Sequence, residues 1–216
     1  MHKLDHIVFG ANTLEKGTKF VENIFQAKLS DIGYHNDMGT HNRVIKISDE
    51  VYLEVVAIDP NMENSKYRRW FNLDNPNLQL KLEKSPQIIG YVIEKNDRIP
   101  LKYYNPFFNA SRSNYRWQFS MPNYRNNILD PEIIETGIIP SLISWKSEKP
   151  INQMKSNQFE LIKFEIVLPE SQPHFNTFLK TFGDIKHVSV ASKFTENAPI
   201  FKLKIKDKLR NMIVLL

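Results

Sequence analysis

Two short segments rich in aliphatic and aromatic residues, Leu4–Phe9 and Val51–Val56, each place an ionisable side chain where a buried β-strand is expected. Because successive side chains of a strand alternate between its two faces, His6 is predicted to share a face with Leu4, and the opposite faces of both segments are apolar. A buried imidazole or carboxylate is costly unless something pairs with it. The segments therefore predict a metal ion, a hydrogen-bonded network or a polar ligand beside His6 and Glu54.

The surrounding residues predict a βαβββ unit over residues 1–60. After the first strand, Asn12 is suited to cap a helix, and a helix with one apolar face is expected to run to about Phe25. A short extended piece, a polar loop and two further strands follow, from Asn42 to Ile47 and from Val51 to Ile58. A turn that contains a proline then closes the unit.

Residues 159–216 repeat this order of elements. A strand is expected from Phe159 to Leu168, and Ser171 with Pro173 is expected to begin a helix that Gly183 ends. Three β-rich runs complete the unit, at residues 188–191, 201–206 and 212–216. The first and last parts of the chain thus share one order of elements, which suggests an ancestral duplication.

The middle of the chain is less regular. Strands are predicted at residues 88–94, 117–121 and 138–145, with a helix that is short or lost. The polar stretches 95–116 and 122–137 are expected to be loops over a binding face, because long connections in compact domains are usually functional or disordered. The chain is therefore divided into a domain of residues 1–145, which combines the unit 1–60 with a degenerate unit 88–145, a linker of residues 146–158, and the C-terminal unit 159–216.

The composition limits the function classes. The 216 residues contain no cysteine, which excludes disulfides, thiol nucleophiles and thiolate zinc sites. The apolar run that opens the chain is too short for a signal peptide or a spanning helix, so a cytoplasmic protein without a membrane partner is expected. No phosphate-binding loop, dinucleotide fingerprint, zinc-protease motif or nucleophile elbow occurs, so no nucleotide cofactor is expected.

The net charge of +5 has two interpretations. Part of the excess lies in residues 201–208, where lysines alternate with apolar residues, as is typical of a strand with one solvated face. Two clusters that combine arginine with aromatic residues, at 67–70 and 114–117, keep single-stranded nucleic-acid binding as an alternative. The solvated face is the favoured interpretation, and nucleic acid is not among the expected partners.

Several short stretches of the chain carry a resemblance to a known protein family. The main ones are Leu4-Asp5-His6-Ile7-Val8, Tyr34-His35, Gly39-Thr40, Asn42-Arg43 and Tyr52-Leu53-Glu54-Val55-Val56, and weaker ones lie at 68–71, 90–91, 111–112, 116–117 and 139–145. On these residues the chain resembles the glyoxalase-like members of the vicinal oxygen chelate superfamily, which also includes bleomycin resistance proteins and dioxygenases. The resemblance implies βαβββ modules that pair into a cupped sheet, with metal ligands on the first and last strands of each module.

On that pattern, the resemblance makes His6 and Glu54 the metal-ligand positions of the first unit. An imidazole and a carboxylate suit divalent zinc, iron, manganese or nickel, and such an ion would polarise adjacent oxygens of a substrate. Where the second unit would need a histidine and a glutamate, it offers only Gly90 or Tyr91 and Ser144. The chain thus departs from the four-ligand pattern of the superfamily.

Without a metal ion, His6 and Glu54 are an acid–base pair in the same pocket. Desolvation would raise the pKa of Glu54, whereas a protonated His6 would lower it, and the sequence leaves both outcomes open. His35 is the best candidate for a third metal ligand and, alternatively, for a substrate contact. The other residues expected to contact substrate are Thr40, Asn42, Tyr52, Arg112, Trp117 and Trp145, with Arg112 binding an acidic group.

Together these features predict an α+β fold of repeated βαβββ modules, in which cupped mixed sheets surround a cavity and helices lie outside. The leading hypothesis is a glyoxalase-like small-molecule enzyme of the lyase, isomerase or dioxygenase type, acting on a substrate with vicinal oxygens with or without one divalent metal ion. The alternative is a non-catalytic protein of the drug-resistance type that sequesters an aromatic or cationic small molecule. Because modules of this superfamily pair within one chain or between two chains, a homodimer is also left open.

Overall fold

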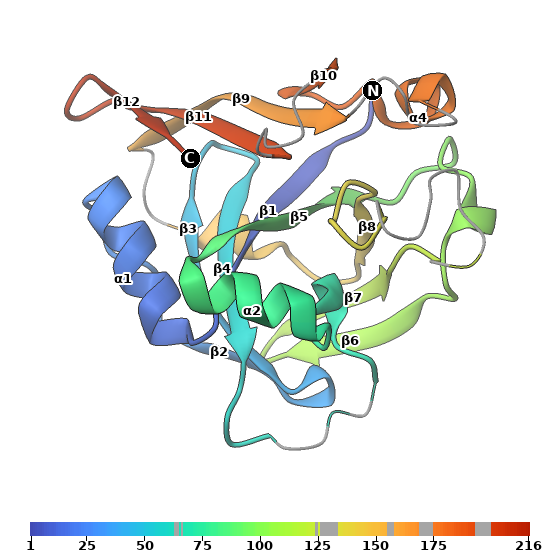
Figure 1. The fold of residues 1–216 in the computed structure, drawn as a ribbon, viewed down its shortest axis with the longest axis horizontal. Helices are drawn as coiled ribbons and strands as arrows, with labels where there is room; N and C mark the ends of the chain where they lie inside the picture. Colours follow the sequence, from blue (N-terminus) through green and yellow to red (C-terminus); the bar gives the residue numbers. More distant parts are fainter. Residues whose placement is uncertain are drawn as a thin grey trace.

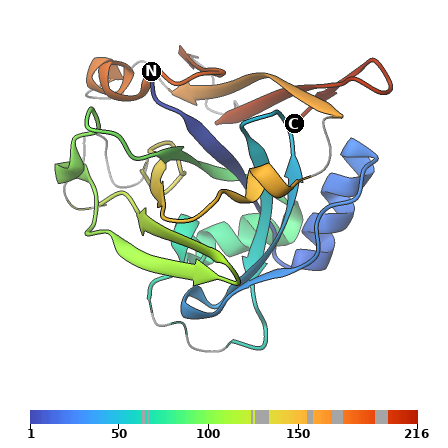
Figure 2. The same ribbon diagram turned by 180° about the vertical axis from the view of Figure 1, so that it is seen from behind.

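In the part of this α+β protein that the structure describes, the strands form two sheets, one of eight strands and one of four. The computed structural model describes residues 1–62, 65, 67–123, 125, 134–154, 158–168, 175–192 and 200–216. The eight-stranded sheet curls into a cup, and the four-stranded sheet lies across the outside of that cup near both chain termini (Figures 1 and 2). The predicted architecture of cupped mixed sheets around a cavity is confirmed.

The first unit of the cup has the predicted order of elements. It consists of β1 (Leu4–Gly10), α1 (Leu14–Phe25), β2 (Gly33–His35), β3 (Thr40–Lys46) and β4 (Tyr52–Ile58). The helix is capped by Thr13 rather than by the expected Asn12, because the Thr13 side chain accepts a hydrogen bond from the Lys16 amide at 3.2 Å. Every residue of β1 is buried, since this strand lies between β4 and the second unit.

The second unit of the cup repeats the strand pairing of the first. It consists of β5 (Gln87–Glu94), β6 (Phe108–Arg112), β7 (Tyr115–Ser120) and β8 (Ser141–Trp145). In both units the first strand pairs in parallel with the fourth, as β1 does with β4 and β5 with β8. The expected loss of its helix is confirmed, since only the 3-10 turn Leu101–Tyr103 lies between β5 and β6.

One strand of this unit corrects the sequence analysis. Strand β6 lies within residues 95–116, which were predicted to be a loop. It pairs with β7 through a tight turn at Ser113, whose φ of 51° lies in the left-handed region. The polar composition of β6 obscured it, because its exposed edge position does not require an apolar face. Most of the predicted loop 122–137 lies outside the described residues.

The C-terminal unit has the predicted order of elements but a different pairing. It consists of β9 (Phe159–Leu168), α4 (Phe175–Phe182), β10 (Val188–Ser192), β11 (Phe201–Asp207) and β12 (Met212–Leu215). Its first strand pairs in parallel with its second strand, and not with its fourth. The repeat visible in the strand pairing therefore relates β1–β4 to β5–β8, and not to the C-terminal unit as expected. The residues expected to begin the helix, Ser171 and Pro173, lie outside the described residues.

Apolar side chains cover both faces of the cup. On the outer face, α1 and the inner side of the four-stranded sheet pack against Ile7 and Phe9 of β1. On the inner face, Leu82 of α2 (Pro76–Lys84) joins a second apolar cluster. Helix α2 was missed by the sequence analysis, although Asn75 caps it with its side chain and Pro76 takes its first position. In the described part of the chain, no helix is long and apolar enough to cross a membrane.

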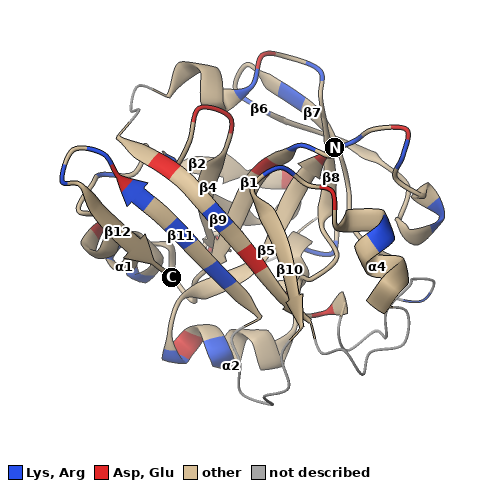
Figure 3. Ribbon diagram, turned by 90° about the horizontal axis from the view of Figure 1, so that it is seen from above, with Lys and Arg blue, Asp and Glu red and all other residues tan. Residues whose placement is uncertain are grey.

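Charged residues lie along β9 and β11 of the four-stranded sheet (Figure 3). The alternation predicted for residues 201–208 is confirmed, because Phe201, Leu203 and Ile205 are buried while Lys204 is exposed. Glu165 on β9 forms ion pairs with Lys163 and, at 3.5 Å, with Lys202. The lysines of β11 therefore lie on the solvated side of their strand, next to the acidic Glu165 of β9.

Candidate functional site

A β-bulge near the start of β1 turns an additional acid toward the inside of the cup. Leu4 pairs with Ile93 of β5, while His6 pairs with the very next residue of β5, so that Asp5 is an extra residue in β1. Two consecutive side chains, Asp5 and His6, therefore lie on one side of the sheet. Leu4 instead joins the outer core. This corrects the prediction that His6 shares a face with Leu4, because strict alternation fails at a bulge.

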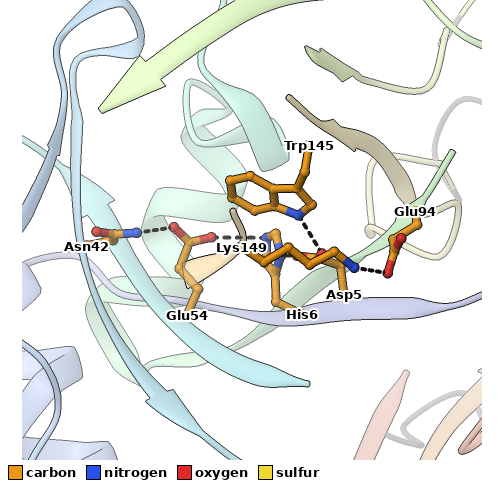
Figure 4. Close-up of polar contacts among 7 residues, drawn as sticks. All are labelled: Asp5, His6, Asn42, Glu54, Glu94, Trp145 and Lys149. Atoms are coloured by element: carbon orange, nitrogen blue, oxygen red, sulfur yellow. Dashed lines mark hydrogen bonds and ion pairs between the residues drawn. The ribbon is translucent and has the colours of Figure 1, made fainter. Parts of the chain in front are cut away.

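The imidazole of His6 lies between two carboxylates (Figure 4). Its Nδ1 is 2.6 Å from Asp5 Oδ1, and its Nε2 is 3.5 Å from Glu54 Oε2. Tyr52 stacks on the imidazole with the ring centroids 4.7 Å apart. The three ionisable side chains expose 7% or less of their surface. The predicted meeting of His6 with Glu54 is thus present, with Asp5 added to it.

The two carboxylates determine the charge of His6. Burial alone would lower the pKa of His6, but hydrogen bonds to Asp5 and Glu54 and their negative charges outweigh burial and raise the pKa from 6.5 to about 9. Burial also opposes the ionisation of Glu54, yet the neighbouring His6 lowers the pKa of Glu54 from 4.5 to about 2. At neutral pH an imidazolium therefore lies beside an ionised Glu54. Of the two shifts that the sequence left open for Glu54, the lowering prevails.

Hydrogen bonds extend this cluster in both directions across the cup (Figure 4). At one end, Trp145 Nε1 donates to Asp5 Oδ2 at 2.7 Å. At the other end, Asn42 Nδ2 donates to Glu54 Oε1 at 2.5 Å, and Arg112 donates to Asn42 Oδ1 at 2.7 Å. Since Arg112 can only donate, it fixes which end of the Asn42 amide points toward Glu54. The Asn42 side chain thus holds Glu54 as an acceptor.

The cluster borders a small hollow that opens into a wide groove. The hollow has a volume of about 40 Å³ and is lined by His6, His35, Asn42, Val44, Tyr52, Glu54, Trp70, Phe71, Arg112, Tyr115, Trp117, Phe119, Ile143, Trp145 and Pro150. The groove has a volume of about 840 Å³ and shares His35, Trp70, Arg112 and Trp117 with the hollow. A space of this size admits one reacting group or a few waters, so the rest of a larger ligand would lie in the groove.

The structure brings together eight of the nine residues expected at the site. His6, His35, Asn42, Tyr52, Glu54, Arg112, Trp117 and Trp145 all line the hollow. Thr40 does not line it, but its hydroxyl lies 3.2 Å from Nδ1 of His35. Burial lowers the pKa of His35 to about 4, so His35 is neutral at physiological pH. His35 is therefore suited to form hydrogen bonds and unsuited to carry a charge.

Sequence reasoning missed much of the aromatic wall. Trp70 and Phe71 line the hollow from an irregular segment after β4, in which Phe71 has a φ of 53°. Tyr115 and Phe119 come from β7. The chain has only three tryptophans, and all three line the hollow. Each is spaced too far from the others in sequence to predict that meeting.

The two basic-aromatic clusters of the sequence contribute to this wall. In residues 67–70, Trp70 lines the hollow, while Arg69 forms an ion pair with Asp74 at 2.7 Å and donates to the Gly39 carbonyl. In residues 114–117, the indole of Trp117 is likewise buried against the hollow. The tryptophans of both clusters are thus turned inward, away from a surface on which nucleic-acid bases would stack, whereas Tyr67 is exposed.

The donors around His6 do not fit a resident divalent ion. Within the described ranges, no three His, Asp or Glu side chains are grouped so as to hold a metal. Asp5 occupies Nδ1 of His6 at 2.6 Å, so His6 has one nitrogen left for an ion, and that nitrogen lies 3.5 Å from Glu54 Oε2. The second unit contributes Ile143 and Trp145 to the lining, and Tyr91, one of the expected positions, is buried in the outer core. The cluster is instead arranged for hydrogen bonding and proton transfer.

Comparisons with known proteins agree with this architecture. A family model described as "Glyoxalase-like domain" matches residues 4–181. No curated protein sequence matches the chain. Among solved structures, a hypothetical protein from Staphylococcus aureus is similar with 16% identity and a TM-score of 0.63, over 100% of this chain and 98% of that one. At this level of identity the likeness extends to the fold alone.

Two weaker structural likenesses involve enzymes from Streptomyces coelicolor. A methylmalonyl-CoA epimerase is 11% identical, with a TM-score of 0.43, over 68% of this chain and 97% of that one. A variant of 4-hydroxymandelate synthase is 11% identical, with a TM-score of 0.39, over 72% of this chain and 52% of that one. Both likenesses cover a part of the chain.

Proposed function

The chain belongs to the glyoxalase-like domain family of the vicinal oxygen chelate superfamily. From its site we propose that it is a small-molecule enzyme of the isomerase or lyase type, which moves a proton at the carbon next to a carbonyl group. In this proposal Glu54 is the general base and His6 is the general acid. The substrate carries vicinal oxygens, one of which accepts the hydrogen bond of His6.

One observation carries the proposal: the imidazole of His6 and the carboxylate of Glu54, 3.5 Å apart, border the same hollow. A donor and an acceptor at this separation reach the oxygen and the neighbouring carbon of one small group together. Their burial strengthens electrostatic interactions with any charge that develops there. The nearby aromatic side chains exclude water, which protects a reactive intermediate from solvent.

Two protons move in the proposed step, one from the substrate to Glu54 and one from His6 to the substrate. Glu54 removes a proton from the carbon beside the carbonyl, and the electron pair of that C–H bond moves toward the carbonyl oxygen. His6 hydrogen-bonds this oxygen through Nε2–H and donates its proton to it, which gives an enediol or enol. Asp5 holds Nδ1 of His6 throughout, so that the imidazole keeps its orientation. Glu54 then delivers its proton to the former carbonyl carbon while the other hydroxyl of the enediol returns a proton to Nε2 of His6, which completes an isomerisation and restores both side chains.

The low pKa of Glu54 is a property of the resting pair. His6 lowers the pKa of Glu54 because it is positively charged and hydrogen-bonded. When His6 donates its proton to the substrate, that positive charge disappears and the pKa of Glu54 rises toward that of a buried carboxyl. Glu54 therefore becomes a stronger base during the same step in which His6 loses its proton.

Hydrogen–deuterium exchange tests this function. We expect the protein to replace the hydrogen next to the carbonyl by deuterium when small 2-hydroxy ketones or 2-oxo acids are incubated with it in D2O. The measurement is the loss of that proton signal by ¹H NMR, relative to the heat-denatured protein. Failure of the folded protein to exchange any member of either series would remove the proposal.

Addition and removal of metal ions provide a second prediction. Because the donor set does not fit a divalent ion, we expect neither zinc nor a chelator to change the urea midpoint of the protein at neutral pH. Metal content is measured on the same samples by mass spectrometry. Three results together would instead assign His6 as a metal ligand. The wild-type protein would contain stoichiometric metal, its urea midpoint would fall in chelator, and the midpoint of His6→Ala would not change in chelator.

A second candidate function rests on the aromatic lining. Trp117, Trp145 and Tyr52, which were expected to line a binding cavity, all border the hollow beside a carboxylate. Aromatic faces with a nearby negative charge also bind organic cations. Sequestration of an aromatic or cationic molecule predicts tight binding of such a ligand with no deuterium exchange, so the exchange experiment distinguishes the two functions.

A further inference from the structure

An arginine bridges the gap between the two edges of the cup. Strands β2 and β6 are the two edges of the eight-stranded sheet, and they contact each other. The side chain of Arg112, at the end of β6, crosses this seam and donates to Asn42 on β3. On its way it passes directly over Gly33 of β2, where a Cβ atom would lie 2.1 Å from Arg112 Nη1. Only glycine at position 33 leaves room for this arrangement.

The guanidinium of Arg112 has no carboxylate partner in the part of the chain that the structure describes. Its hydrogen-bond acceptor is the neutral amide of Asn42 at 2.7 Å, and its guanidinium carbon lies 5.9 Å from the ring centre of Tyr115. The two acids on the groove wall, Asp31 and Asp37, are exposed and form no ion pair with Arg112. An arginine with most of its donors uncommitted is suited to bind an anion.

The position of Arg112 connects it to the reacting pair. Arg112 lines both the hollow and the groove, and one amide side chain, that of Asn42, separates it from the Glu54 carboxylate. An anionic group bound by Arg112 therefore leaves the adjoining atoms of the same molecule beside Glu54. Because the hollow holds only about 40 Å³, the anionic group and the reacting carbonyl must be close neighbours.

We propose that Arg112 recognises the carboxylate of a 2-oxo acid, with the acid group at the seam, the carbonyl in the hollow and the remaining chain in the groove. This inference rests on the proposed function, since it names the substrate class of the same site. A carboxylate accepts two parallel hydrogen bonds from a guanidinium, whereas the Asn42 amide accepts one. Since Arg112 uses one of its five N–H donors on Asn42, its other donors are available to pair with the acid group.

Tryptophan fluorescence reports on this binding, because all three tryptophans line the hollow. We expect 2-oxo acids from pyruvate to 2-oxooctanoate to bind the wild-type protein and change its emission. We expect the matching 2-oxo amides to bind with at least tenfold lower affinity. Arg112→Gln is expected to weaken acid binding at least tenfold. The control Arg116→Gln, which removes an exposed arginine from the neighbouring strand, is expected to bind acids like the wild type.

Gly33→Ala moves the charge without removing it. The new methyl group would lie 2.1 Å from Arg112 Nη1 and 2.5 Å from Asn42 Oδ1, so it would push the guanidinium away from Asn42, and the backbone of Gly33 is not in the left-handed region, so alanine is compatible with it. We expect this variant to keep its circular dichroism spectrum and urea midpoint close to wild type and to bind the acids more weakly, in the same direction as Arg112→Gln. Acid binding at wild-type affinity in both variants would overturn the inference.

The remaining outcomes separate this inference from the proposed function. Acid binding that depends on Arg112, without deuterium exchange, would uphold acid recognition and refute the proton-transfer function. Exchange of neutral hydroxy ketones with no effect of Arg112→Gln would uphold the function and refute acid recognition. No change in fluorescence with any acid of the series at millimolar concentration would also refute acid recognition.

Discussion

Replacement of Glu54 by glutamine is expected to reduce deuterium exchange by about 10²- to 10⁴-fold, the usual contribution of a positioned general base. Glutamine has nearly the same shape, and its carbonyl oxygen still accepts the hydrogen bond from Asn42, so the fold is expected to persist. The amide cannot remove a proton from carbon. The rate of exchange is measured by NMR at saturating substrate, together with the urea midpoint of each protein.

A matched control separates loss of the base from loss of a negative charge. Glu165→Gln removes a carboxylate from β9, on the outer face of the four-stranded sheet, and is expected to exchange like the wild type. The NMR signals of His6 provide a second readout: loss of the negative charge at Glu54 lowers the pKa of His6 from its wild-type value of about 9. Full exchange activity in Glu54→Gln would show that another group is the base.

The strands and the central pair of the site were readable from the sequence for a simple reason. Apolar runs with an alternating pattern define strands wherever one or both faces are buried, and strands β4 and β9 lie within one residue of the predicted limits. His6 and Glu54 stood out because ionisable residues in such runs need partners. Their meeting follows from the parallel pairing of β1 with β4, and before the structure it was indicated only by the family resemblance, which places ligands on the first and last strands of a module.

The remainder of the site depends on features that alternation and composition do not encode. The bulge that turns Asp5 inward is visible only in the pairing of β1 with β5. Phe71 reaches the hollow through an irregular backbone with a left-handed φ, which no periodic pattern predicts. The closure of the cup by Arg112 depends on the space above Gly33, seventy-nine residues earlier in the chain, and so on tertiary structure alone.

Asp5→Asn is expected to destabilise the protein by about 3 kcal/mol at neutral pH, as is typical when one partner of a buried ion pair is removed. Asparagine presents a donor and an acceptor where Asp5 accepts from both His6 and Trp145, so one of these two hydrogen bonds is lost. The free energy of unfolding is measured by urea titration. Asp49→Asn, at an exposed turn position, serves as the control and is expected to unfold like the wild type.

The dependence of this loss on pH identifies its cause. His6 has a folded-state pKa raised to about 9 from 6.5, so its protonated form stabilises the wild type fully below pH 6.5, and this contribution is lost as the pH rises through 9. Without the Asp5 charge the folded-state pKa of His6 falls, and the variant has less of this contribution to lose. The difference in unfolding free energy between wild type and Asp5→Asn should therefore be largest near pH 6 and shrink by pH 10. A difference that stays constant over this range would mean that Asp5 acts through packing, and that His6 is not an imidazolium at the floor of this site.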